Sequence, residues 1–513
     1  MNSLKVEIRK GAYYDSVTLM LISKEIKKLE GVESALIGMG TDLNKELAKN
    51  LNISNEEIEN CGVNDLFISV LGNVEIEDVS KLVDELLSKK KSSSVDDYKP
   101  VSLESAISIQ RDSNLAIISV AGCYAAEETE KCLRKGLNVL LFSDNISVED
   151  ERRLKEMARE RNLLVMGPDC GTAIINNVPL AFANKVRKGN IGIVGASGTG
   201  IQEVTVLIHK LGAGVSQVIG TGGRDLKVSI GGITMLQGID ALKYDEDTKV
   251  IVLISKPPEK SVMEKVLEAA RDTGKPTVVC FIGGNEKEIK GENIEFTASL
   301  EEAAKKSVSL LKNVNDVELE CINKEVNEAI IEKCKKNIKP SQKYLRGLFT
   351  GGTLAYEVMN YMEQQGFEIN SNIATKKEYE LKNPNISVGN TVIDFGDDYF
   401  TSGRPHPMID PSIRAERIEK ELQDEEVAVV VMDFVLGYGS NEDPVGETIP
   451  SILKAKEVAA LKGNTVLFIA YVCGTDDDPN DYRGSIKRLR DLDVVVVESN
   501  YKAAKLCEKI LNI

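Results

Sequence analysis

Residues 191–203 read I-G-I-V-G-A-S-G-T-G-I-Q-E. This stretch predicts a short buried strand over residues 191–194, a turn of small residues, and a helix that begins near Thr199 or Gly200. Such a turn leaves backbone N–H groups open to a ligand, and the helix dipole adds about half a positive charge. The pattern therefore predicts a phosphate-binding turn at Ser197, Gly198, Thr199 and Gly200. A purely steric use of the small residues is the alternative.

A second copy of the pattern lies at residues 348–357, which read L-F-T-G-G-T-L-A-Y-E. In both copies Gly-Thr is followed by three residues and a glutamate, Glu203 or Glu357. Gly351, Gly352 and Thr353 are therefore predicted to form a second phosphate-binding turn. The similarity continues in the same order, because residues 222–225, 250–255 and 277–283 correspond to residues 395–398, 427–433 and 465–474. We interpret this as a weak repeat of one α/β module.

Composition restricts the class of protein. A chain of 513 residues predicts about three or four domains, and its net charge of −16 argues against a nucleic-acid partner. No apolar run approaches a membrane span, and the first ten residues lack the core of a signal peptide. Nine cysteines without a C-x-x-C pair favour reduced thiols in the cytoplasm. With only His209 and His406, no zinc spacing appears, and no bound metal is expected.

The order of the predicted elements indicates an α/β protein of several domains with parallel sheets. Residues 1–95 form a small α/β domain, and residues 96–186 alternate strand and helix as in a Rossmann-like domain. The first repeat module covers residues 187–312, a charged helical connector covers residues 313–342 with its helix predicted over 317–337, and the second module covers residues 343–513. No G-x-G-x-x-G follows the first strand of the Rossmann-like part, so a dinucleotide is not indicated.

Two further loops carry candidate binding or catalytic residues. Gly222, Gly223, Arg224 and Asp225 follow a predicted strand, and a glycine-rich loop with one arginine binds an anionic group or is a mobile surface loop. Residues 397–411 read D-D-Y-F-T-S-G-R-P-H-P-M-I-D-P.

In that second loop two prolines flank His406 and hold its imidazole in place. His406 is therefore a candidate general acid/base or transient nucleophile, and Arg404 a candidate clamp for a carboxylate or phosphate. The alternative is an ordinary loop histidine. His209 lies on a helical pattern and is expected to be a surface or boundary residue.

Taken together, these motifs resemble FdrA proteins, relatives of succinyl-CoA synthetase, over nearly the whole chain. Residues 116–136 with Gly167-Pro168-Asp169-Cys170-Gly171 look like the CoA-binding domain of the synthetase α subunit. Ser197-Gly198-Thr199 with Glu203 looks like the S-G-T loop of that subunit, and residues 222–225 look like its G-G-D-P loop. Residues 343–513 look like the carboxyl-terminal domain of the β subunit. The resemblance implies two flavodoxin-like ligase modules whose helix ends face one shared phosphate.

The chain also departs from the synthetase pattern. Residues 283–287 read G-G-N-E-K, without the histidine that the synthetase α subunit phosphorylates in the corresponding loop. The synthetase glutamate after the preceding strand is replaced near Ser255-Lys256-Pro257, and neither an ATP-grasp domain nor a P-loop is present in the sequence. The resemblance therefore implies chemistry that pairs an acyl group with phosphate without a phosphohistidine.

Three functions remain open. The first is a subunit of oxamate carbamoyltransferase, which converts oxalurate and phosphate into oxamate and carbamoyl phosphate in purine and allantoin degradation. The two turns would then grip phosphate, Arg404 or Arg224 would hold the carboxylate, and His406 would shuttle a proton. The second is an ADP-forming acyl-CoA synthetase subunit with a separate nucleotide-binding chain. The third is a non-catalytic scaffold that binds CoA or a metabolite. CoA stays open as a cofactor, and separate subunits and a homo-oligomer are the expected partners.

Overall fold

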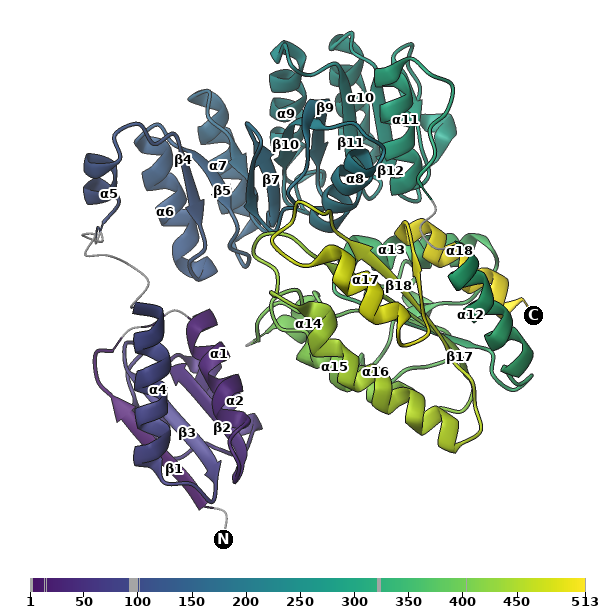
Figure 1. Ribbon diagram of the computed structural model, residues 1–513. Helices are drawn as coiled ribbons and strands as arrows, with labels where there is room; N and C mark the ends of the chain where they lie inside the picture. The colour runs from purple at the N-terminus through teal and green to yellow at the C-terminus, as the bar shows by residue number, and fades with distance from the viewer. Residues whose placement is uncertain are drawn as a thin grey trace. The chain divides into compact units, whose positions relative to one another are not determined.

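The computed structural model describes residues 3–12, 14, 16–91, 100, 102–320, 324–402 and 404–512 (Figure 1). They divide into two compact units. The first comprises Met1–Ser102 together with Asp398–Pro405, and the second comprises Leu103–Asp397 together with His406–Ile513. Residues 92–99, which include the predicted boundary between the first two domains, lie outside the described residues.

The first unit is a three-stranded antiparallel sheet of order β1-β3-β2 with helices on both faces. Neighbouring residues of β3 point to opposite faces, so Ile68 packs with α1 and α4 while Phe67 packs with α2 and α3. Its elements are β1 (Ser3–Arg9), α1 (Ser16–Lys27), β2 (Val32–Met39), α2 (Asp42–Asn50), α3 (Glu56–Asn60), β3 (Leu66–Gly72), α4 (Ile76–Lys91) and, from the later segment, α14 (Asp398–Thr401).

The second unit begins with a parallel three-stranded sheet of order β4-β5-β6. Alternate residues of its strands, among them Val139 and Leu141, pack under α6 and α7. The elements are α5 (Leu103–Ile109), β4 (Leu115–Ile118), α6 (Gly122–Arg134), β5 (Asn138–Leu141), α7 (Val148–Glu160) and β6 (Val165–Met166).

The next sheet has seven strands in the order β13-β12-β11-β9-β10-β7-β8. Strands β9 to β13 are parallel and follow the 2-1-3-4-5 order of the flavodoxin-like fold, and β7 and β8 add an antiparallel hairpin at one edge. The elements are β7 (Thr172–Ile175), β8 (Val178–Ala181), β9 (Lys188–Gly195), α8 (Gly198–Lys210), β10 (Val215–Gly220), α9 (Ile233–Tyr244), β11 (Val250–Ser255), α10 (Lys260–Asp272), β12 (Thr277–Phe281), η1 (Glu286–Glu288), β13 (Ile294–Phe296) and α11 (Leu300–Lys312).

The last sheet has six parallel strands in the order β15-β16-β14-β17-β18-β19. Apart from the two-residue edge strand β15, its five strands β14 and β16 to β19 repeat the 2-1-3-4-5 order. Its elements are α12 (Lys324–Asn337), β14 (Tyr344–Phe349), α13 (Gly352–Gln364), β15 (Asn370–Ser371), η2 (Lys377–Tyr379), β16 (Thr391–Asp394), α15 (Ser412–Glu421), β17 (Val427–Val435), α16 (Pro444–Leu461), β18 (Leu467–Cys473), α17 (Tyr482–Arg490), β19 (Val494–Val497) and α18 (Asn500–Leu511).

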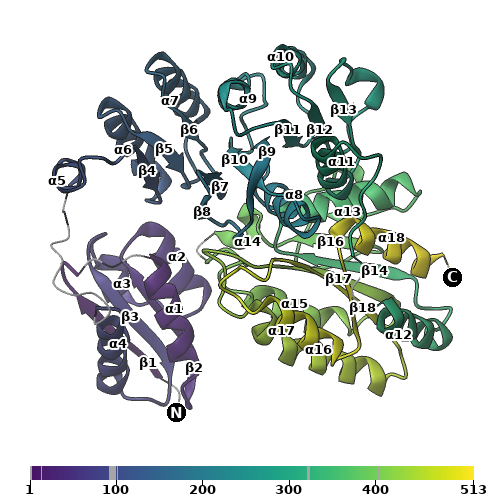
Figure 2. The same cartoon turned by 45° about the horizontal axis from the view of Figure 1, so that its top comes forward.

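One hydrophobic core continues through both modules. Helices α8, α11, α13 and α18 pack against one another between the seven-stranded and six-stranded sheets (Figure 2). Buried apolar residues from all four helices, such as Val204, Ala303, Val358 and Ala503, contribute to it. The two modules are therefore held as one body by the burial of these helix faces.

These observations confirm the α/β class with several parallel sheets, and the repeat predicted from the sequence is present in the strand order. The predicted helix over residues 317–337 was wrong at its start, because residues 317–320 are not helical and α12 begins at Lys324. Leu319 is instead buried in the core from an extended segment. The numerical domain boundaries stay a prediction, although β7 and β8 pair with the sheet of the first module.

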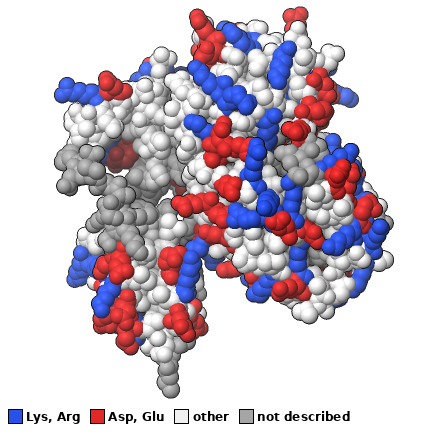
Figure 3. Space-filling view, in the orientation of Figure 1, with Lys and Arg blue, Asp and Glu red and all other residues white. Residues whose placement is uncertain are grey.

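No helix in the described ranges is long and apolar enough to cross a membrane. The cysteines among the described residues are free thiols. Figure 3 shows Lys and Arg side chains interspersed with Asp and Glu over the visible face, so the excess of acidic residues does not form one continuous patch there.

Candidate functional site at the facing ends of two helices

The two predicted phosphate-binding turns lie against each other. Ser197 caps α8, because its Oγ accepts a hydrogen bond of 3.1 Å from the Gly200 N–H. The same Oγ lies 2.6 Å from Oγ1 of Thr353, in the first turn of α13. The N-terminal ends of the two helices therefore meet directly, one from each repeat module (Figure 2).

Small residues make this approach sterically feasible. A Cβ placed at Gly351 would lie 2.8 Å from Cγ2 of Thr199, and a Cβ at Gly200 would lie 3.1 Å from Cγ2 of Thr353. Both distances are shorter than ordinary van der Waals contacts between carbon atoms. The glycines of the two motifs thus allow the helices to come into contact, in addition to leaving their N–H groups exposed.

Several backbone N–H groups at this junction have no acceptor within the part of the chain that the structure describes. The first turn of a helix has no intrahelical partners for its N–H groups, and those of Gly198, Thr199, Gly352 and Thr353 find no acceptor elsewhere among the described residues. Both helix dipoles direct their positive ends at the same point. The arrangement can hold an anion with several oxygen atoms, such as phosphate.

A buried ion pair shapes the turn before α13. Oδ1 and Oδ2 of Asp433 accept the N–H groups of Thr350 and Gly351 at 2.8 Å each, and Arg414 pairs with Oδ1 at 3.2 Å. Asp433 and Arg414 are both buried. These two N–H groups are therefore satisfied by the protein, so the ligand-facing donors of α13 begin at Gly352.

Two buried glutamates connect the modules reciprocally. Glu203 of α8 accepts the N–H of Asn500, the first residue of α18, at 3.1 Å. Glu357 of α13 accepts the N–H of Leu300, the first residue of α11, at 2.8 Å, and the side-chain amide of Asn500 at 2.8 Å. The glutamate of each repeated G-T-x-x-x-E motif thus caps the last helix of the other module, which fixes α8 against α13. Burial raises the pKa of both carboxyl groups.

Asp394 brings a carboxyl group to the start of α13. A Cβ placed at Gly352 would lie only 2.4 Å from its Oδ2, and its Oδ1 accepts the Gly396 N–H at 2.8 Å. The side chain is buried, and burial raises its pKa to about 7, with Asp397 and Asp433 adding to the rise. Near neutral pH this group can therefore both take up and release a proton.

His406 and Asp394 both lie close to Gly396. A Cβ at Gly396 would lie 2.8 Å from the Nε2 atom of His406 and 3.1 Å from Oδ1 of Asp394. The Nδ1 atom of His406 accepts the Met408 N–H at 3.2 Å, which assigns the ring proton to Nε2. Burial lowers the pKa of His406 to about 4. The imidazole is thus neutral at pH 7 and suited to donate a hydrogen bond from Nε2.

Lys256 supplies a positive charge beside this group of residues. It follows β11 directly, and its ammonium lies 4.5 Å from the ring centroid of Tyr356 in α13. Desolvation lowers its pKa, against the opposing effects of the Asp394 and Asp397 charges. The side chain remains accessible to solvent. Lys256 can therefore bind the charged end of a substrate near Asp394.

The other predicted residues are placed differently. Asp225 is buried, pairs with Lys155 at 2.7 Å and accepts the N–H groups of Thr234 and Met235 in α9. Arg224 pairs with a buried glutamate of α7 at 3.0 Å. Gly222 and Gly223 belong to the same loop. Gly222 has a φ of +82°, and a Cβ placed there would lie 2.2 Å from the carbonyl oxygen of Pro168. The substrate-binding role of these four residues stays a prediction, and the structure gives both charged side chains internal partners.

Arg404 belongs to the segment Asp398–Pro405, which groups with the first compact unit, and its side chain is exposed. Its catalytic role stays a prediction. His209 is half-buried near the end of α8, and its Nδ1 accepts the Arg187 N–H, as expected of a boundary residue.

The sequence analysis did not select Asp394 or Lys256 as site residues. Each stands at the carboxyl end of a parallel strand, β16 or β11, which is where ligands bind in α/β sheets. A charged residue directly after an apolar strand was the signal that could have identified them.

Comparison with known proteins shows to which family this chain belongs. The chain is 46% identical over 511 residues to the uncharacterized protein YahF of Escherichia coli (strain K12), covering 99% of both chains. The chain belongs to the YahF family. Within this YahF-family chain a CoA-ligase model matches residues 348–510, and a CoA binding domain model matches residues 186–283.

More distant relatives of this YahF-family chain are CoA ligases. The succinate–CoA ligase [ADP-forming] subunit alpha 2 of Archaeoglobus fulgidus is 28% identical over 182 residues, which cover 34% of this chain and 60% of the relative. The acetate–CoA ligase [ADP-forming] of Methanocaldococcus jannaschii is 28% identical over 225 residues, covering 39% of this chain and 30% of the relative. The chain is therefore succinyl-CoA-synthetase-like, and it spans only part of these ligases.

Residues 1–100 match a model described as AllF, heavy metal-associated domain. The residues present do not fit a heavy-metal site. This part of the chain contains one cysteine, Cys61, and no histidine, whereas soft metals are bound by thiolate and imidazole ligands. Cys61 is buried, and burial raises the pKa of its thiol. The described residues hold no group of three His, Cys, Asp or Glu side chains that could bind a metal ion.

Proposed function

We propose that this protein is a subunit of an enzyme that transfers a carbamoyl group to phosphate: oxalurate and phosphate are converted to oxamate and carbamoyl phosphate. The observation that carries the proposal is the meeting of two helix N-termini, where the N–H groups of Gly198, Thr199, Gly352 and Thr353 find no acceptor among the described residues. The loop after β12 reads G-G-N-E-K and has no histidine to phosphorylate. A direct attack by bound phosphate requires neither a phosphohistidine nor a nucleotide.

In this reaction a phosphate oxygen forms a bond to the carbamoyl carbon of oxalurate, and the bond from that carbon to the ureido nitrogen breaks. The proton of the hydrogen phosphate ion passes to the departing nitrogen, which gives the amide of oxamate. Atoms and charge balance without a redox partner. The facing helix ends would hold the phosphate oxygens in both substrate and product, where the transition-state charge develops.

The side chains around the helix ends would have distinct roles. Asp394, whose pKa burial raises to about 7, would relay the proton. His406 would donate a hydrogen bond from Nε2, since burial lowers its pKa to about 4 and disfavours the predicted proton shuttle. Lys256 would bind the oxalurate carboxylate, a role that the sequence analysis gave to Arg404 or Arg224.

The proposal is tested by phosphate-dependent turnover of oxalurate by the chain with its co-expressed subunits. Asp394→Asn should lower kcat by at least about a hundredfold, which is the usual contribution of a positioned acid/base group. His406→Ala should also lower kcat. Unchanged turnover in the His406→Ala variant would remove that residue from the mechanism, and unchanged turnover in both variants would contradict the site.

The second candidate is a subunit of an ADP-forming acyl-CoA ligase. It is favoured by the matches to the CoA-ligase and CoA binding domain models. In that case the facing helix ends would hold the phosphate of an acyl phosphate, and a separate chain would supply the nucleotide-binding domain. Acyl-CoA formation that requires both CoA and ATP with such a partner would favour this function over carbamoyl transfer.

A further inference from the structure

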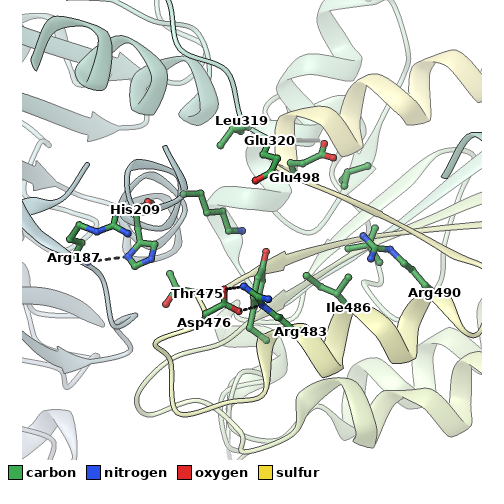
Figure 4. A pocket seen from close by; sticks show the side chains of 14 residues that line it. Arg187, His209, Leu319, Glu320, Thr475, Asp476, Arg483, Ile486, Arg490 and Glu498 are labelled. Atoms are coloured by element: carbon green, nitrogen blue, oxygen red, sulfur yellow. Dashed lines mark hydrogen bonds and ion pairs between the residues drawn. The ribbon is translucent and has the colours of Figure 1, made fainter. Parts of the chain in front are cut away.

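A pocket of about 260 Å³ lies at the opposite end of α8 from the facing helix ends (Figure 4). It is bordered by the end of α8, the segment after α11, the loop after β18, and α17. Four arginine or lysine side chains line it, and the charged or histidine members of its wall are Arg187, His209, Lys210, Glu320, Asp476, Arg483, Arg490 and Glu498. The cations of the lining outnumber its carboxylates by one, although the chain as a whole has a net charge of −16.

Internal ion pairs account for only part of this charge. Arg483 and Asp476 form a two-contact pair at 2.7 Å for each bond, and Oε2 of Glu498 pairs with Lys502 at 3.0 Å. The NH1 group of Arg187 donates to the carbonyl groups of His209 and Ala213 at the end of α8. This last contact is the ordinary capping of a helix C-terminus by a cation.

The donors that remain face the pocket. Lys210 has no carboxylate within 4 Å among the residues that the structure describes, and its ammonium lies 4.8 Å from the ring centroid of Tyr482. His209 accepts the Arg187 N–H at Nδ1, so its proton is on Nε2. Arg187 uses only NH1 in the hydrogen bonds of the described region, although a guanidinium has five N–H donors.

One acceptor also remains. Oε1 of Glu498 is buried and has no hydrogen-bond partner within the described part of the chain. A buried carboxylate oxygen without a donor is costly, so a ligand that brings a hydroxyl or amide N–H would stabilise it. Figure 4 shows Glu498 on the side of the pocket opposite Asp476 and Arg483, so the pocket has a separate polar group for a second part of a ligand.

We infer that this pocket binds a small anionic metabolite, a carboxylate or a phosphate ester, that also carries a hydroxyl or amide donor. The anionic group binds Lys210 and Arg187, with a hydrogen bond from Nε2 of His209, and the donor binds Oε1 of Glu498. The cavity volume of about 260 Å³ is sufficient for a small metabolite of this kind.

Binding to the full chain is measured by titration calorimetry with four probes: glycolate, acetate, glycerol 3-phosphate and inorganic phosphate. The hydroxyl-bearing member of at least one pair should bind more tightly than its partner. Lys210→Met should weaken that binding by about tenfold, because one charged hydrogen bond is lost. Lys509→Met removes the same charge from an exposed position of α18 outside the pocket and should leave binding unchanged.

Two further variants locate the ligand. Glu498→Gln should abolish the preference for the hydroxyl-bearing probe. Ser197→Ala alters the phosphate site at the facing helix ends and should leave that preference intact. A preference among carboxylates assigns a carboxylate ligand, and a preference among phosphates assigns a phosphate ester. The inference is overturned if none of the four probes binds, or if binding is insensitive to Lys210→Met. It is independent of the proposed function, because no readout depends on turnover.

Discussion

Replacing Ser197 by alanine tests the contact between the two helix ends. The substitution removes the N-cap of α8, which costs about 1 kcal/mol of stability, and the 2.6 Å hydrogen bond to Thr353, which costs about another 1 kcal/mol. Thr353→Val removes only the second contribution, since Thr353 lies inside the first turn of α13. Ser147→Ala is a matched control, because Ser147 caps α7 by the same hydrogen bond away from this junction.

Urea denaturation should therefore give losses of about 2 kcal/mol for Ser197→Ala and about 1 kcal/mol for each of Thr353→Val and Ser147→Ala. The double variant of Ser197 and Thr353 should lose about 1 kcal/mol less than the sum of its single variants, since both remove the same hydrogen bond. Calorimetry with inorganic phosphate should show weaker binding for the two junction variants and none of this effect for Ser147→Ala. Additive losses, or phosphate binding that is equal in Ser197→Ala and Ser147→Ala, would refute the reasoning.

Three other perturbations have defined outcomes. Asp394→Asn should lower turnover yet stabilise the fold, because a folded-state pKa raised to about 7 makes stability fall as pH rises from 3.8 to 7. The gain in the free energy of unfolding, measured by urea denaturation, should be larger at pH 8 than at pH 5 by up to about 3 kcal/mol, which is two pH units at about 1.36 kcal/mol each. An equal gain at both pH values would contradict this. Burial raises the pKa of Glu203 and Glu357, so stability is lost as pH rises above the pKa values of these groups in the unfolded chain. Glu203→Gln or Glu357→Gln should therefore flatten the pH dependence of the urea midpoint. An unchanged pH dependence would argue against buried carboxyl groups that retain their protons. Lys155→Met should cost about 3–5 kcal/mol, because it leaves the buried carboxylate of Asp225 without a cationic partner. A thermal midpoint within a degree of the parent would show that the ion pair is dispensable.

Local sequence patterns predicted much of the fold. The apolar strand followed by Ser197, Gly198 and Thr199 predicted a strand, a turn and a helix, because hydrophobic periodicity and small turn residues act within a few positions of the chain. The second copy at Gly352 and Thr353 predicted the repeat, which both sheets show in their strand order. The prediction that these two turns meet came from the family resemblance. It is consistent with the 2.6 Å distance between the hydroxyl oxygens of Ser197 and Thr353.

The rest of the site depends on tertiary placement. Asp394 and Lys256 come from strands of different modules, and nothing in either local sequence shows that both lie beside the start of α13. The prolines around His406 indicated a fixed ring, but the burial that lowers its pKa arises from distant residues such as Phe182, whose ring centroid lies 5.7 Å away. Residues 317–320 have a helical apolar spacing, yet Leu319 gains more by entering the core from an extended segment.

The most direct test of the proposed function is the turnover of oxalurate in the presence of phosphate, followed by the appearance of carbamoyl phosphate, with and without the co-expressed subunits. Carbamoyl transfer to phosphate predicts product in the absence of any nucleotide or CoA, with a rate that saturates in phosphate and falls in Asp394→Asn. Absence of this turnover, together with acyl-CoA formation that requires ATP and CoA, would contradict it and favour an acyl-CoA ligase.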